Sequence, residues 1–166
     1  MRPFLVLLCT ILAFLFVCGC SDTSTENISP GTSSIPTQNP YQDEEFRVAM
    51  NNSINKILER FDDTADDIES NDMNGLATSG ARLSSEAEVQ YEIISGYRVS
   101  GNWLAVKTNF LRYLDSMRLL GDYYSKSAIA AERGDNSLES TYLDMANSEL
   151  EIATEYFDLA QEAIPS

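Results

Sequence analysis

The stretch DEEFRVAMNNSINKILERFDDTADDIES, residues 43–70, decides the fold class of this chain. Its apolar side chains follow one another at steps of three or four residues: Phe46, Met50, Ile54, Ile57, Phe61, Ala65 and Ile68. This spacing places them on one face of an α-helix. The three acidic residues at positions 43–45 suit the positive end of the helix dipole. The stretch therefore predicts an amphipathic helix that must bury its apolar face against other helices.

The same periodicity returns in two later segments, and no proline interrupts residues 43–164. The segment from Trp103 to Ala131 carries one apolar stripe, and Gly134 after it is a typical helix stop. A last helix is expected to open at Asn136 and to carry two neighbouring stripes. One stripe comprises Tyr142, Met145, Ile152, Tyr156, Leu159 and Ala163, with Glu149 as a misfit inside it; the other comprises Leu143, Ala146, Leu150, Ala153, Phe157, Ala160 and Ile164. Such a wide apolar face predicts contact with two neighbouring helices.

Residues 72–98 give the weakest helix signal. Gly75 and Gly80 would each cost about 1 kcal/mol relative to alanine inside a helix. A capping pattern at residues 85–88 lets a helix begin only there, whereas small residues at 73–84 would suit a helix in close contact with a neighbour. The prediction is an all-α, up-down-up-down four-helix bundle over residues 43–166. The alternative is a three-helix bundle in which residues 72–98 are mostly irregular.

Residues 20–42 are expected to form a flexible linker, because Ser, Thr, Asn and Pro dominate and only Ile28 and Ile35 are aliphatic. Three prolines in this segment prevent a continuous helix and favour extended backbone. Asn27 and Asn51 each open a triplet of the N-glycosylation type. Such triplets are common by chance, so the sequence leaves open whether either residue is modified.

Residues 1–19 are typical of a signal peptide, because Arg2 precedes an apolar run shorter than the roughly 20 residues that span a bilayer. The run ends in Val17-Cys18-Gly19-Cys20, which resembles the lipobox of prokaryotic membrane lipoproteins. That resemblance implies cleavage before Cys20 and a diacylglyceryl group on its sulfur. The expected location is the cell membrane, with the chain lipid-anchored on its extracytoplasmic side. The alternatives are an ordinary cleaved signal peptide and an uncleaved anchor helix.

The composition excludes several classes of function. The formal net charge is -15, and a surface this acidic repels the phosphate backbone of nucleic acids. The chain has no histidine, and its three cysteines all lie in the first twenty residues. The residues after Cys20 therefore cannot form most zinc or haem sites, and they cannot form a catalytic Ser-His or Cys-His pair. We expect no cofactor, no nucleic-acid partner and no enzymatic activity.

Two groups of residues are candidate binding sites. Carboxylates at helical spacing, which a hard divalent cation could bridge, are Asp62, Asp63, Asp66 and Asp67, although a solvated acidic helix end is the commoner explanation of such a run. Aromatic side chains that could line a groove for a small ligand or a peptide include Trp103, Tyr123 and Tyr124, although core packing is their commoner role. Tyr123 and Tyr124 point about 100° apart, so one of them should lie near the surface.

The leading functional hypothesis is a non-enzymatic interaction or envelope module that contacts the membrane through lipid on Cys20. The alternative is a small-ligand-binding or sensory bundle, which resembles the extracytoplasmic four-helix sensor domains of chemoreceptors in architecture only. Fold alone does not carry function, so the two hypotheses are separated by the surface of the bundle. A ligand site predicts a pocket, whereas an interaction module predicts an exposed apolar patch.

Overall fold

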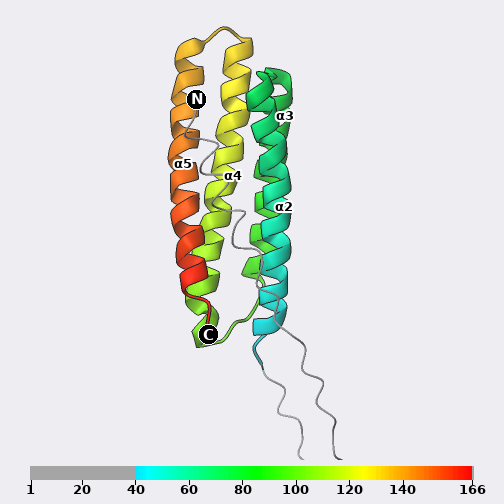
Figure 1. Cartoon of the computed structure of the whole chain (residues 1–166), viewed down its shortest axis with the longest axis vertical. Coiled ribbons are helices and arrows are strands. Elements are labelled where there is room, and N and C mark those ends of the chain that lie inside the picture. The colour runs from blue at the N-terminus through cyan, green and yellow to red at the C-terminus, as the bar shows by residue number, and fades with distance from the viewer. Residues whose placement is uncertain (1–39, 166) are drawn as a thin grey trace, which may run out of the picture. The chain divides into compact units, whose positions relative to one another are not determined.

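A computed structural model describes residues 40–165, and the expected signal peptide, Cys20, Asn27 and nearly all of the linker lie outside this range. The described part is helical: α2 Asp43–Ser70, α3 Met73–Ser95, the short 3-10 helix η1 Gly101–Trp103, α4 Leu104–Glu132 and α5 Asn136–Glu162. The four long helices run alternately up and down (Figure 1). This confirms the predicted all-α four-helix bundle. The three-helix alternative is wrong, because residues 73–95 form one continuous helix.

Aspartate side chains cap the starts of two of the four long helices, α3 and α5. The carboxylate of Asp72 accepts a hydrogen bond from the Gly75 amide at 2.9 Å, so α3 begins twelve residues before the capping pattern at position 85. The carboxylate of Asp135 caps α5 in the same way by accepting from the Leu138 amide at 3.1 Å. The turn before α5 is closed by Gly134, whose φ of 72° lies in the left-handed region that favours glycine.

The helices α3 and α4 cross where two glycines meet. A methyl group on Gly80 would lie 2.7 Å from the Gly121 carbonyl oxygen, and one on Gly121 would lie 2.5 Å from the Gly80 carbonyl oxygen. The Ser125 hydroxyl near this crossing donates a hydrogen bond of 2.9 Å to the Ala77 carbonyl of α3. Glycine therefore lets the two backbones approach closely, which offsets its cost within each helix. The expectation of a helix with small contact residues over 73–84 is confirmed.

The helices pack in the order of the chain: α2 on α3, α3 on α4, and α4 on α5. The helices α2 and α5 make little or no close contact, and they lie on opposite sides of α4 in Figure 1. The expectation that the last helix packs against two neighbours is therefore wrong. Its second stripe supplies the fully buried residues Ala146, Ala153 and Ala160, whereas Tyr156 and Ala163 of the first stripe pack partly against the core. The rest of the first stripe lies on the surface, as Met145, Ile152 and Leu159 show, and Leu138 at the start of α5 is similarly exposed.

The helices in residues 40–165 are too polar for a membrane span, since none contains a long enough apolar stretch.

Candidate functional site

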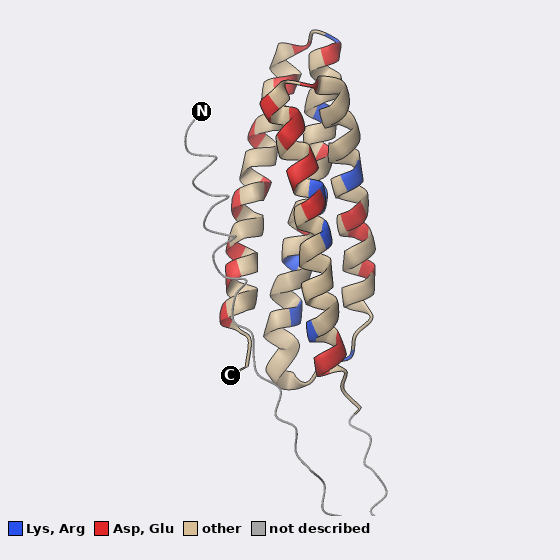
Figure 2. Cartoon of the chain, turned by 45° about the vertical axis from the view of Figure 1, so that its right-hand side comes forward, with Lys and Arg blue, Asp and Glu red and all other residues tan. Residues whose placement is uncertain are grey.

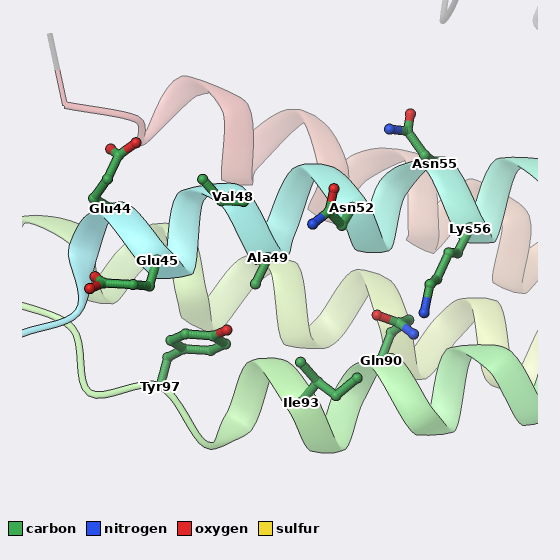
Figure 3. Close-up of a pocket in the computed structure, with 10 residues that line it drawn as sticks. All are labelled: Glu44, Glu45, Val48, Ala49, Asn52, Asn55, Lys56, Gln90, Ile93 and Tyr97. Carbon is green, nitrogen blue, oxygen red and sulfur yellow. The ribbon is translucent and has the colours of Figure 1, made fainter.

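An open groove of about 740 Å³ runs between α2 and α3 (Figure 3). Its lining mixes apolar and polar side chains: Glu44, Glu45, Val48, Ala49, Asn52, Asn55, Lys56, Gln90, Ile93 and Tyr97. Val48 and Ile93 are unusually accessible for aliphatic residues, with exposed fractions of 47% and 43%. We call these ten residues the α2–α3 groove.

The loop that follows α3 borders one end of the groove. The backbone carbonyl of Tyr97 in this loop accepts a hydrogen bond of 2.5 Å from the Lys107 ammonium group. The carboxylate of Asp43 accepts another of 2.7 Å from the Ser100 amide, which ties the loop to the start of α2. The ring of Tyr97 also packs edge-on against Phe46, with centroids 6.1 Å apart. These contacts fix the aromatic ring at the groove end independently of any bound molecule.

A series of polar side chains, joined by hydrogen bonds and an ion pair, lies at the other end of the groove. The hydroxyl of Ser53 on α2 donates to the side-chain oxygen of Gln90 on α3 at 2.8 Å, and both residues are buried. The Gln90 amide group donates in turn to Glu86 at 2.7 Å, and Glu86 lies 3.6 Å from the Lys56 ammonium group. Because unpaired buried polar groups are costly, this chain favours one register of α2 on α3. It also holds Lys56 at the groove.

The charges of the groove are separated along its length. Figure 3 shows the carboxylates of Glu44 and Glu45 at one end and Lys56 with Gln90 at the other. Arg47 donates to Glu44 at 2.5 Å, and this hydrogen bond holds the pKa of the Glu44 carboxyl below its usual value. Beyond Lys56, a second hollow of about 360 Å³ is lined by Arg60, Arg82, Ser85, Glu86 and Val89. At the acidic end, Glu45 forms no ion pair within residues 40–165. At the other end Lys56 and Arg60 are paired with carboxylates, and Arg82 is the cation that forms no ion pair within the same residues.

The groove lining contains no cysteine, histidine or hydroxyl beside a general base. Its side chains can exclude water over a short apolar floor and can form hydrogen bonds and ion pairs at the rim. These are the properties of a binding surface, in which apolar contact supplies affinity and polar groups supply orientation.

The four predicted cation ligands lie along α2, away from the groove lining. Asp62, Asp63 and Asp66 are exposed and Asp67 is half-buried. Asp63 is paired with Arg60 at 3.3 Å. Partial burial, followed by the charges of Asp66 and Asp63, raises the pKa of Asp62. Within residues 40–165, no three acidic side chains converge to hold a metal ion, so the geometry lends the cation site no support.

The three predicted aromatic contacts do not form one surface. Trp103 packs edge-on against Phe46, with centroids 5.8 Å apart, and it lies about 30 Å along α4 from Tyr123. Tyr123 is half-buried and stacks on Tyr142 of α5, whereas Tyr124 is 2% exposed. The expectation that only one of the two adjacent tyrosines points outward is confirmed. All three side chains pack against other helices or the core, and none lines the groove.

Buried tyrosines predict that the fold is lost in alkali. Burial raises the pKa of Tyr113, and it raises the pKa of Tyr124 to about 12. Because an unfolded tyrosine ionises near pH 10, each should remove up to about 1.4 kcal/mol of stability per pH unit above that value. The urea midpoint should fall between about pH 10 and 12. Replacing Tyr113 and Tyr124 by phenylalanine should flatten this fall, whereas the same change at the exposed Tyr91 should not; equal curves for all variants would refute the assignment.

The principal groove residues are absent from the candidates derived from sequence. In the sequence, Val48 and Ile93 lie outside the main apolar stripes of their helices. This position is the sequence signal that could have identified them as exposed aliphatic residues. Single exposed aliphatic residues are common on protein surfaces, so the signal gains meaning only when the fold places two of them across one groove.

In comparisons with family models, with curated proteins and with solved structures, nothing matches this chain.

Proposed function

We propose that this protein is a non-enzymatic interaction module of the cell envelope, tethered to the membrane by lipid on Cys20. The lipobox-like residues 17–20 and the proline-containing linker support the tether. The α2–α3 groove carries the proposal for the helical domain, because it exposes aliphatic side chains between charged ends and holds no catalytic set. The groove binds a segment of a partner protein.

The shape of the groove favours a peptide segment over a small molecule. Small-molecule sites usually enclose most of the ligand surface, whereas this groove is open along its length. From Glu44 to Lys56 the groove follows twelve residues of α2, or about 18 Å. About three helical turns, or an extended segment of about five residues, with two or three apolar side chains fills that length.

The charge separation defines the expected partner. Its segment carries a basic group at the Glu45 end and an acidic group at the opposite end, toward Arg82. Such complementarity sets orientation and the rate of association more than it sets affinity. Salt should therefore weaken binding mainly by slowing association.

Site-specific photo-cross-linking in native membranes tests this function. A photoreactive residue at Ile93 should produce a discrete adduct with another protein, and the same residue at Asn147, exposed on α5, should not. The substitution Val48→Asp places a charge on the apolar floor and should reduce the Ile93 adduct at least severalfold. Because Val48 is already exposed, circular dichroism should show unchanged folding.

An absent Ile93 adduct, or one indifferent to Val48→Asp, would overturn the proposed docking groove. A small molecule retained in native mass spectrometry and lost in Val48→Asp would instead establish the ligand-binding alternative.

A further inference from the structure

The helix α5 leaves an apolar row on the surface. Four side chains, exposed by 38–43%, recur at steps of seven residues: Leu138, Met145, Ile152 and Leu159. We call them the α5 stripe. A strict seven-residue repeat follows the seam of two supercoiled helices and drifts by about 20° per repeat on a straight helix. The repeat is therefore suited to a second helix, and no helix of residues 40–165 covers it.

The stripe is long enough to be an interface. The helix α5 has 27 residues and is about 40 Å long, so a strip about 10 Å wide covers about 400 Å². Monomeric proteins rarely expose apolar patches of more than a few hundred Å² unless the patch has a function.

One edge of the stripe is strongly acidic, and α5 contains no lysine or arginine (Figure 2). This acidic edge comprises Asp144, Glu151, Glu155, Asp158 and Glu162. None of its members forms an ion pair within residues 40–165. The edge therefore lacks a cationic neighbour in a single copy of the described domain.

The opposite edge of the stripe borders α4, where Lys126 is paired with Asp122 at 2.6 Å and Arg112 is the unpaired cation. The Lys126 ammonium group lies 5.8 Å from the ring centroid of Tyr123, which stacks on Tyr142 of α5. Arg112 precedes Tyr123 by about three turns, so it lies on the same side of α4. Arg112 is exposed and forms no ion pair within residues 40–165.

We propose that the α5 stripe binds the α5 stripe of a second copy of this chain, in a parallel, twofold-symmetric dimer. With the twofold axis along the helices, the acidic edge of each copy faces the α4 border of the other, where Arg112 is the unpaired cation. In an antiparallel pair the axis is perpendicular to the helices, so the two acidic edges meet and repel. Charge complementarity therefore selects the parallel arrangement.

The dimer is weak in solution and strengthened on a membrane. Two stripes bury about 800 Å² together, which is below the 1,200–2,000 Å² of stable interfaces. Anchoring both copies to one membrane raises their effective concentration and also keeps them parallel. Only this last step rests on the proposed function; the stripe and its charges do not depend on the groove or on the lipid.

Cysteine cross-linking of the full chain tests the dimer, because residues 21–166 contain no cysteine. In a parallel twofold pair each stripe residue faces its own counterpart. Single cysteines at Leu138, Met145, Ile152 and Leu159 should therefore all give disulfide-linked dimers upon mild oxidation in membranes. Asn147→Cys, on the solvent side of α5, and the unaltered chain with Cys9, Cys18 and Cys20 set the background.

Matched substitutions test whether the contact is specific. Ile152→Glu should reduce the Met145→Cys cross-link severalfold, whereas Val89→Glu, at a similarly exposed residue of α3, should leave it unchanged. Arg112→Glu should also weaken it, because this change removes the cation facing the acidic edge. Cross-linking no stronger than that of Asn147→Cys would overturn the dimer. Cross-linking at one stripe position alone would indicate an antiparallel pair, and adducts with a different protein would indicate another occupant.

If the proposed anchor is wrong, the purified chain should give the same pattern of cross-linked residues in solution, but only at high protein concentration, because the dimer is weak without a membrane. Failure of the anchor and failure of the dimer are therefore distinguishable.

Discussion

Replacing Gly121 by alanine should lower the free energy of unfolding by about 2–3 kcal/mol, although alanine is the better helix former. The new methyl group would lie 2.5 Å from the Gly80 carbonyl oxygen and 2.6 Å from the Ser84 amide nitrogen. Both neighbours are backbone atoms of α3, so relief requires the two helices to separate. Separation loosens the core on both sides of the crossing, where Leu83 and Tyr124 are buried.

The sign of the change in the free energy of unfolding distinguishes the effect of helix packing from that of helix propensity. Propensity alone predicts a gain of about 1 kcal/mol for alanine in place of glycine inside a helix. The matched control is Gly96→Ala, where φ is −68° and the new methyl group would have no neighbour closer than 3.5 Å. This control should leave the stability unchanged within about 0.5 kcal/mol.

Urea unfolding followed by circular dichroism measures both variants. For a domain of this size, the expected loss in Gly121→Ala corresponds to a fall of roughly 10 °C in Tm. Gly80→Ala should behave alike, and the double variant should lose less than the sum, because one methyl group already separates the helices. An increase in stability for Gly121→Ala would show that α3 and α4 do not cross at the two glycines.

Cys20→Ser should abolish lipid attachment, which is the largest change expected from any single substitution in this chain. The proposed lipid binds through the Cys20 sulfur, and serine offers no thioether. Each buried methylene contributes about 0.8 kcal/mol of membrane affinity, so two long acyl chains give nearly permanent anchoring. The acidic helical domain supplies no substitute, since its charge disfavours anionic lipid surfaces.

Metabolic labelling with a clickable fatty acid, followed by immunoprecipitation, measures this effect. The unaltered chain should carry the label, and Cys20→Ser should carry none. Cys18→Ser is the matched control, because it removes a neighbouring thiol but leaves the residue to be modified. Equal labelling of all three forms, or equal loss in both variants, would refute attachment at Cys20. Loss of the mature chain from the membrane fraction in Cys20→Ser would show that lipid alone holds it there.

The local sequence predicted the helices well because their signals are local. The stripe from Phe46 to Ile68 matches α2, and Gly134 marks the turn before α5. The start of α3 was harder to predict, because two signals competed. The pattern at residues 85–88 resembled a cap, while Asp72 was the actual cap thirteen residues earlier. Gly80 weakened the helix prediction, because its close contact with Gly121 of α4 cannot be inferred from the local sequence.

The candidate site was predicted poorly because it depends on which residues face each other. Trp103, Tyr123 and Tyr124 were reasonable candidates by residue type, but packing against other helices or the core occupies all three. Val48 and Ile93 form a groove only because α2 and α3 are paired in one register by the hydrogen bond between Ser53 and Gln90. No local pattern contains that pairing.

By itself, the sequence determined the helical class, the acidic surface and the absence of histidine and late cysteine chemistry, but it left open whether there are three or four helices. A period of 3.6 residues depends only on neighbours along the chain, so it can be read without a structure. Only the tertiary structure decided which of the two α5 stripes is buried. Ala146, Ala153 and Ala160 allow close packing on α4, and this contact leaves Met145 and Ile152 outside. Periodicity defines the faces of a helix, whereas the crossing of helices distant in sequence decides which face is covered.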